Sequence, residues 1–516
     1  MAAGIHGFTG GAAMRGRARA GLGLLAAAAG AWLPAACTVG PNYAPPRLKM
    51  DGAFGPLVAG TNPATEPAGV VVDGALQEWW KSFNDPLLDQ LIARGLAANL
   101  DLRQAALRIR AARSQEAQVA GGAYPQVNAN GGYTRQRYSQ NAAPFNAFNV
   151  PGFPWEFNLY ELGFDASWEV DIFGGTRRAV EAAGADYAAA LEDASAVRVS
   201  VAAEVARNYI ELRGYQHEEE LARRNLAVQK ESLEITQEQM NKGVGTQLDV
   251  SRAQAEVAAT EAAIPVLERG AWEAIVRLSV LTNDSTDNLQ ILEDARPLPG
   301  VPASVVVGVP ADLLRRRPDV RAAERRLAAA TARIGEAQAA LYPRLSLTGF
   351  FNLQSASISD LFQWKSRAFS LGPAVEWPIF EAGTLRAAVD VRTAQQAERL
   401  AAYEAVVRQA VADVRDSLVE FTTERQRGGS LEQAVAADRT ALELAQGLYR
   451  QGLTDFLTVL DAERELFSAE DALARSESDE ETSLVGLYKA LGGGWQADRR
   501  AAGATTQDAN DAVKHE

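Results

Sequence analysis

The sequence predicts a mixed α/β membrane protein whose 516-residue chain is internally duplicated. Three observations support this fold class. Landmarks recur in the same order in both halves, a period of two marks strands long enough to cross a membrane, and long proline-free stretches carry helical spacing. We therefore expect each chain to contribute four transmembrane strands and two long helical hairpins.

The N-terminal segment has the pattern of a secretory signal. Three arginines precede an apolar stretch that is too short for a comfortable membrane span. Cys37, the only cysteine, follows directly, and cleavage before it would leave its thiol at the new N-terminus for lipid attachment. We expect a signal peptide over 1–36, with Met14 as an alternative start, and a lipid-anchored extension over 37–84. The alternative is an inert thiol in an ordinary secreted protein.

The two halves of the chain share a set of landmarks. Each half begins with an Ala- and Arg-rich helix that ends at Tyr-Pro, and continues through two strands, a long helix, a turn and a return helix. The matching segments are Asn99 to Val127 with Arg317 to Leu345, Asp171 to Ala179 with Pro378 to Ala387, and Lys242 to Glu256 with Gln451 to Glu465. The predicted parts are a first repeat over 85–295, a connector over 296–310, a second repeat over 311–496 and a disordered tail over 497–516.

The predicted strand from Leu159 to Ile172 carries the clearest period of two. Arg344 to Gln354 repeats the pattern, and weaker strands are expected at Gln126 to Arg137 and Phe369 to Trp377. A soluble sandwich would show the same alternation, but little of the remaining chain could form a second sheet over the apolar face. An apolar outer face and a polar inner face suit a transmembrane barrel.

One face of the strongest strand carries acidic side chains. In a barrel these would line the lumen and make it electronegative, which favours cationic or neutral solutes. The residues concerned are Glu161, Asp165, Glu169 and Asp171. The alternative is that these carboxylates merely keep the lumen wet.

Four strands cannot close a barrel, and open sheet edges in lipid would leave backbone groups unpaired. Several chains must therefore share one barrel. Two chains would give the smallest barrel with a filled interior, and three would give twelve strands and room for a lumen.

Two very long helices follow the strands. Proline is absent from Thr176 to about Met240 and from Thr384 to about Gln451, so nothing interrupts helices of roughly 65 residues, or about 100 Å. A coiled-coil rod or bundle is one interpretation. The other is a helical tube that continues the barrel, because each long helix begins a few residues after a strand ends.

Composition argues against several function classes. The net charge of −14 disfavours nucleic-acid binding, because phosphates need a basic surface. One cysteine and three histidines do not supply the ligands of a zinc site or a Cys/His nucleophile, and the glycine-rich turns lack the spacing of a phosphate-binding loop. We expect no enzyme activity, no metal and no cofactor.

Several motifs resemble the TolC-like outer-membrane efflux channels, and specifically their NodT-type lipoprotein branch. These motifs are "CTVGPNYAPP" (Cys37 to Pro46), "WWKSFNDPLLDQLI" (Trp79 to Ile92), "VPADLLRRRPDVRAAE" (Val309 to Glu324) and "VLDAER" (Val459 to Arg464). The resemblance implies a homotrimer in which twelve strands span the outer membrane and an α-helical barrel continues into the periplasm. It also implies a periplasmic membrane-fusion adaptor and an inner-membrane pump of the resistance-nodulation-division class as partners.

The resemblance also assigns roles at the turns between the long helices and their return helices. These turns would lie at the periplasmic end, where the adaptor binds, and comprise Gly243, Val244, Gly245, Gly452, Leu453 and Thr454. The family closes this end with a ring of acidic groups. Matching on "VLDA" assigns Asp461 to the ring, and Asp455 supplies a second charge because Thr458 occupies the companion position. For both aspartates the alternative is an ordinary solvated or helix-capping residue.

The function implied is a passive, gated conduit that exports small molecules such as drugs across the outer membrane. Two other functions stay open. One is a channel of the same fold that serves protein secretion, and the other is a periplasm-spanning coiled-coil lipoprotein without a pore.

Overall fold

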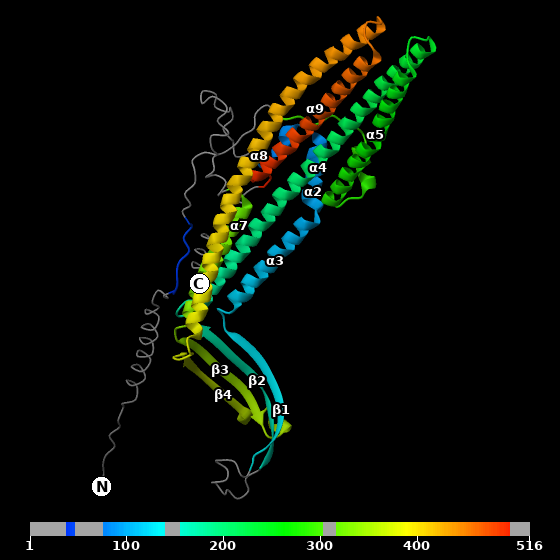
Figure 1. Cartoon of the computed structure of the whole chain (residues 1–516). Helices are drawn as coiled ribbons and strands as arrows, with labels where there is room; N and C mark the ends of the chain where they lie inside the picture. The colour runs from blue at the N-terminus through cyan, green and yellow to red at the C-terminus, as the bar shows by residue number, and fades with distance from the viewer. Residues whose placement is uncertain (1–37, 47–75, 140–154, 303–315, 496–516) are drawn as a thin grey trace, which may run out of the picture. The chain divides into compact units, whose positions relative to one another are not determined.

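The computed structural model describes residues 38–46, 76–139, 155–302 and 316–495. Cys37, the predicted signal peptide, the predicted tail and much of the connector lie outside these residues. The helices are α2 (Pro86–Ala98), α3 (Leu100–Gly121), α4 (Gly175–Asn241), α5 (Gln247–Thr282), α7 (Pro318–Ala339), α8 (Thr384–Arg450) and α9 (Phe456–Ala490). The strands are β1 (Gln126–Arg137), β2 (Glu156–Val170), β3 (Arg344–Ser355) and β4 (Arg367–Glu376), as Figure 1 shows.

The element order runs twice through helix, strand, strand, long helix and return helix. The first series is α3, β1, β2, α4 and α5, and the second is α7, β3, β4, α8 and α9. The described residues divide into two compact units: unit 1 comprises 38–44, 114–139, 155–185 and 328–398, and unit 2 comprises 45–46, 76–113, 186–302, 316–327 and 399–495. Unit 1 contains the sheet, unit 2 contains the helical hairpins, and α4 and α8 contribute residues to both.

Unit 1 holds one antiparallel sheet in the order β1-β2-β3-β4. The four predicted strands are confirmed, with bounds that differ from the expected ones by a few residues at most. The central pair β2 and β3 joins the two repeats, running from Tyr160 opposite Ser355 to Val170 opposite Leu345. Among the described residues β1 pairs only with β2 and β4 only with β3, so the sheet has two open edges.

The long helices α4 and α8 are 67 residues each, or about 100 Å at 1.5 Å per residue. Their bounds confirm the expected stretches to within about a residue, because no proline interrupts either one. The return helices are shorter, with 36 residues in α5 and 35 in α9. In the part of the chain that the structure describes, no helix is long and apolar enough to cross a membrane.

The core of unit 2 is built around the "WWKSF" motif, which forms the short 3-10 helix η2 (Trp79–Phe83). Trp79 is buried and stacks on Tyr488 of α9, with ring centroids 5.1 Å apart. Asp85 caps α2 by accepting from the backbone N–H of Leu87 at 2.8 Å, and it also accepts from the hydroxyl of Tyr209 at 2.5 Å. Burial, together with this hydrogen bond, raises the pKa of Tyr209 to about 12. The segment 79–85 is therefore structural and connects α2, α4 and α9.

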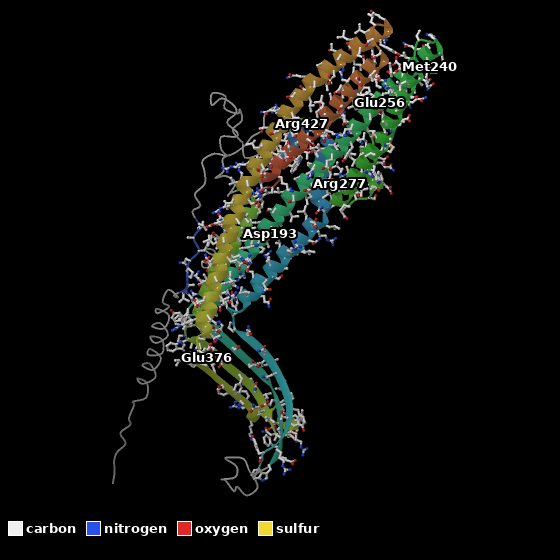
Figure 2. The ribbon with its side chains drawn as sticks, viewed as in Figure 1. Asp193, Met240, Glu256, Arg277, Glu376 and Arg427 are labelled. Carbon is white, nitrogen blue, oxygen red and sulfur yellow. The ribbon has the colours of Figure 1, made fainter. Side chains whose placement is uncertain are left out.

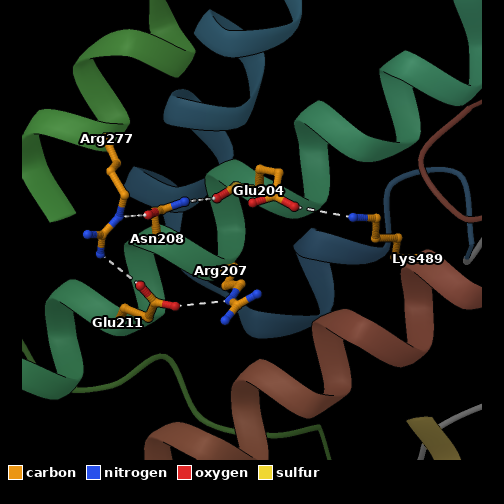
Figure 3. Close-up of polar contacts among 6 residues, drawn as sticks. All are labelled: Glu204, Arg207, Asn208, Glu211, Arg277 and Lys489. Carbon is orange, nitrogen blue, oxygen red and sulfur yellow. Dashed lines mark hydrogen bonds and ion pairs between the residues drawn. The ribbon is translucent and has the colours of Figure 1, made fainter. Parts of the chain in front are cut away.

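Polar contacts tie α4 to both return helices in unit 2, as Figure 3 shows. Glu204 pairs with Lys489 of α9 at 3.2 Å, and Glu211 pairs with Arg277 of α5 at 2.8 Å. Arg277 also donates to Asn208. Exposed ion pairs contribute little to stability one by one. Their value here is positional, because they fix the rotation of α4 between its two neighbours.

Candidate functional site

The two faces of the sheet differ in polarity. Residues directly opposite each other on antiparallel strands share a face, so the register assigns every side chain to one side. The apolar face exposes large side chains, including Val127, Tyr133, Leu162, Phe164, Leu347, Phe351, Phe369, Leu371 and Val375. An exposed apolar surface of this extent marks contact with a membrane or another protein chain.

Glu161, Asp165 and Glu169 share the opposite, polar face. Asp165 accepts from the side-chain amides of Asn128 at 3.0 Å and Asn130 at 3.1 Å on β1. Glu161 accepts from the side-chain amide of Gln354 on β3 at 2.7 Å. The carboxylates therefore sit in a band of amides and hydroxyls that crosses the strands.

Asp171 lies one residue beyond the end of β2. Its carboxylate accepts from the backbone N–H of Arg177 at 2.9 Å and pairs with the Arg177 Nε at 3.2 Å. An acidic group in this position satisfies a free N–H at the start of α4 and complements the positive end of the helix dipole. The structure thus gives Asp171 a local role at the strand–helix junction.

The residues expected at the helix tips gather in two short turns of unit 2. Gly243 and Gly452 have φ values of 76° and 72°, which a side chain would disfavour. Val244 and Leu453 are 75% and 69% exposed. Met240, labelled in Figure 2, lies in the last turn of α4 beside the first of these tips. Each tip therefore presents an exposed apolar side chain next to a glycine with positive φ.

The return helices begin with mirrored caps. In α5 the side chain of Thr246 accepts from the backbone N–H of Asp249 at 3.2 Å, and Asp249 completes a capping box. In α9 the aspartate comes first: Asp455 accepts from the backbone N–H of Thr458 at 3.0 Å and from its hydroxyl at 2.8 Å. These hydrogen bonds hold the pKa of Asp455 below its usual value. Asp455 is thus a helix cap, and the cap accounts for its conformation.

Asp461 is exposed on α9, and no contact brings it to Asp455 within the described part of one chain. Its neighbour Arg464 reaches across to Glu256 of α5, with a closest approach of 2.7 Å. Glu256 is labelled in Figure 2. The expected acidic ring therefore depends on how copies of the chain come together.

Sequence reasoning missed a buried carboxyl near the tips. Glu463 is 1% exposed and accepts from the hydroxyl of Ser232 on α4 at 2.7 Å, and burial raises its pKa. Tyr449 of α8 likewise donates to the side chain of Gln239 on α4 at 2.7 Å. The available signal was the spacing of Glu463 with Val459 and Leu466, which places it on the apolar side of α9.

Known proteins share this arrangement. A sequence profile described as "Outer membrane efflux protein" matches residues 91–284 and 309–493. The antibiotic efflux pump outer membrane protein ArpC of Pseudomonas putida is 34% identical over 477 residues, which cover 92% of this chain and 96% of that protein. The toluene efflux pump outer membrane protein TtgC, also of Pseudomonas putida, gives the same figures.

A solved structure points the same way. The outer-membrane channel OprN superimposes with a TM-score of 0.81 at 38% sequence identity, covering 89% of this chain and 100% of that chain. The sheet with one apolar and one polar face, the paired long helices and the matches in sequence agree with one another. They confirm the family expected from the sequence motifs: the chain belongs to the outer membrane efflux protein family, whose members are the outer-membrane channels of efflux pumps.

Proposed function

We propose that the chain is the lipid-anchored channel subunit of a tripartite pump and that it passes small molecules outward by diffusion. The observation that carries this function is the sheet of unit 1, which exposes an apolar face, holds carboxylates on the other and keeps two open edges. Three copies close a twelve-stranded barrel, and the long helices continue it into the periplasm. The inner-membrane pump drives transport, so this chain performs no bond chemistry.

Purified protein in a planar bilayer tests the conduit directly. We expect discrete single-channel currents from the trimer. Well-folded trimers that carry no current would contradict a pore and favour a coiled-coil structural lipoprotein.

The lumen is cation-preferring in this proposal, because three copies of each strand carboxylate repel anions. Glu161→Gln combined with Glu169→Gln should shift the reversal potential in a salt gradient toward zero. Asp171→Asn is the matched control, since Asp171 is already paired with Arg177 at the strand–helix junction. An unchanged reversal potential in the double variant would contradict the proposed cation preference but would not contradict the pore itself.

The periplasmic gate is assigned to Asp455 and Asp461, supported by their exposure at the start of α9. Three-fold copies of such carboxylates would hold the closed end through bound cations or arginines. Asp455→Asn with Asp461→Asn removes both charges and preserves the helix cap, since asparagine caps as well as aspartate. We expect a larger conductance than in the wild type, and none of this increase in Asp249→Asn, which alters the cap of the other hairpin. Equal conductance in the wild type, the double variant and Asp249→Asn would reject the gate assignment.

The adaptor contacts the two tips in this proposal, through Gly243, Val244, Gly245, Gly452, Leu453 and Thr454. The exposed Val244 and Leu453 supply apolar contact area there. Val244→Asp and Leu453→Asp should weaken photo-crosslinking between this protein and its adaptor in cells. Crosslinking that stays at the wild-type level would show that the adaptor does not bind through these side chains.

The exported molecules are small drugs or solvents, as the names of the antibiotic and toluene pump relatives suggest. Deleting the gene should lower the minimal inhibitory concentration of several antibiotics, with the set of secreted proteins unchanged. Loss of a secreted protein at unaltered drug susceptibility would instead favour protein secretion.

Cys37 carries the lipid in this proposal, supported by its place directly after the signal-like segment. Cells fed an alkynyl palmitate should label the wild-type protein, and Cys37→Ser should abolish the label. A labelled serine variant would place the lipid elsewhere.

A further inference from the structure

The first described residues of the chain lie across the strand–helix junction of unit 1. Thr38 packs against Gly174, and the backbone N–H of Val39 donates to the carbonyl of Phe173 at 3.0 Å. Phe173 follows β2 and precedes α4. The segment 38–42, called the strap below, is thus held directly beside the end of a membrane strand.

A buried arginine makes most of the contacts to the strap. Arg178 of α4 is 3% exposed, and its Nε donates to the carbonyl of Val39 at 3.1 Å. Its Nη2 donates to the carbonyl of Gly40 at 3.3 Å and to the side-chain oxygen of Asn42 at 2.7 Å. The remaining partner is Glu181, paired at 2.7 Å and itself 45% exposed. Within the described part of the chain, three of the four acceptors of Arg178 therefore come from the strap.

The other wall of this site is a glycine in the second repeat. Gly335 lies inside α7, and a methyl group there would come within 2.8 Å of both the Val39 carbonyl and the Arg178 Nε. Gly40 faces it with a φ of 93°, and a side chain at Gly40 would strike the backbone of Gly335. The strap consequently touches α4 of the first repeat and α7 of the second.

The electrostatics make this site specific for the strap. A buried guanidinium that loses its hydrogen-bond acceptors is destabilising, because its desolvated N–H groups are then left unpaired. Outside the strap, the acceptor of Arg178 among the described residues is the half-exposed carboxylate of Glu181. The helix can therefore keep Arg178 buried only while the strap is in place.

We propose that Arg178 and Gly335 form a docking site for the first residues of the mature chain, which fixes the lipid-bearing end at the rim of the barrel. This inference rests on the proposed acylation of Cys37. Thr38 follows Cys37 directly in the sequence and packs against Gly174, four residues beyond the end of β2. A lipid attached at Cys37 would therefore join the chain next to the docked strap. The anchor and the sheet then enter the membrane at one level, and the strap fastens the two repeats together at that level.

Thiol chemistry tests the dock cleanly because the chain has a single cysteine. Once Cys37 is acylated, a Val39→Cys substitution introduces the only free thiol, at a half-buried position whose backbone contacts are unaffected by the side chain. The rate of maleimide labelling in isolated outer membranes then reports docking. We expect labelling to accelerate at least tenfold when Arg178→Ala or Gly335→Ala is added.

Each variant has a matched control. Arg177→Ala removes the adjacent arginine, which pairs with Asp171 and leaves the strap contacts intact. Gly429→Ala adds a methyl group inside α8, where nothing lies within 4 Å. Both controls should label within twofold of the Val39→Cys parent. If the four variants and the parent label alike, or if the parent already labels as fast as an unfolded chain, the dock does not exist.

Mass spectrometry of the N-terminal peptide separates this result from the proposed acylation. An acylated peptide with slow labelling supports the whole inference. A peptide that lacks the lipid and offers two thiols would overturn the acylation and with it the anchor. An acylated peptide with fast labelling would keep the lipid and reject the dock.

Discussion

The strand–helix junction is closed in the first repeat and open in the second. Phe173 follows β2 and stacks on Tyr342, with ring centroids 4.7 Å apart. Phe380 occupies the same place after β4, yet it is 86% exposed, and Ile379 beside it is 84% exposed. Arg178 is buried under the strap, whereas the corresponding Arg386 of α8 is exposed. The motif that follows the strands is therefore covered by other parts of the same chain in the first repeat and exposed in the second.

The flanking helices explain the difference. The start of α4 is covered on two sides, since Gly122 just beyond α3 lies near Thr176 and Ala339 of α7 lies near Gly175. The start of α8 follows the last strand of the sheet, and its first turns are largely exposed. In the homotrimer we expect the α3 end of the next subunit to cover α8, just as β1 of that subunit completes the edge at β4. We therefore expect the open junction to lie at the subunit interface.

The largest expected effect comes from placing a charge in the open junction. Phe380→Asp should abolish the detergent-resistant trimer, because an isolated carboxylate in a buried interface costs several kcal/mol and each trimer contains three copies. The fraction of protein that migrates as a trimer in gel electrophoresis of unheated membranes measures this effect. Phe362→Asp, in the loop between β3 and β4 and similarly exposed, should leave the trimer intact. A stable Phe380→Asp trimer would show that the junction at Phe380 is not buried between subunits.

The return helices also differ at a matched position, but in the opposite sense, because here the second repeat is buried and the first is exposed. Glu481 of α9 is 3% exposed, whereas Trp272 occupies the corresponding place in α5 and is 48% exposed. One Glu481 oxygen accepts from the backbone N–H of Gly300 at 2.7 Å, and the other is buried without a hydrogen-bond partner in the described chain. Burial raises the pKa of Glu481 to about 8, with Glu477, Glu480 and Asp85 adding repulsion.

This buried carboxyl predicts a pH-dependent stability. The folded chain keeps the proton between about pH 4.5 and 8 while the unfolded chain loses it, so the free energy of unfolding falls as pH rises through that window. Glu481→Gln should remove this dependence and stabilise the protein at pH 7 by up to about 3 kcal/mol. Urea denaturation at pH 5, 7 and 8.5 measures it. Glu273→Gln on α5 is the exposed control, and parallel curves for both variants would contradict the assignment.

The mirrored caps should contribute equally. Thr246→Ala and Asp455→Ala each remove a side-chain acceptor at a helix start, so each should lower the free energy of unfolding by a similar amount. Urea titration of the trimer at neutral pH compares them. For Asp455 the loss should also appear in the wild type as pH falls through the lowered pKa of its carboxyl, because protonation weakens the cap. A much larger loss in Asp455→Ala would indicate that the aspartate does more than cap α9.

The smallest effect tests whether the order of the cap residues matters. Thr246→Asp combined with Asp249→Thr gives the first tip the order found in the second tip. Both residue types cap well, so stability should change by less than about 0.5 kcal/mol. Bilayer conductance should not change either, and a change would show that the first tip is sensitive to where the charge lies.

The sequence was sufficient for the strands and the long helices, because local periodicity and the absence of proline determine them. It was insufficient wherever a side chain's partner depends on how the folded chain turns back on itself or packs. Asp171 resembles one more acidic strand position until Arg177 folds back onto it. In the sequence Glu463 is one member of a charged segment, and only the packing of α4 against α9 shows that it is buried. The structural role of "WWKSF" likewise becomes visible only from the stacking of Trp79 on Tyr488. Such contacts depend on tertiary packing, which periodicity does not encode.

The open sheet edges have a consequence for the cell. A single exported chain carries an apolar sheet face with backbone groups ready to pair along β1 and β4, which is the arrangement that promotes aggregation. The hazard lasts from export until three chains meet. We therefore expect the yield of functional channel to depend steeply on the supply of periplasmic chaperones, and overproduction of the chain to be toxic well before the membrane is saturated with pores.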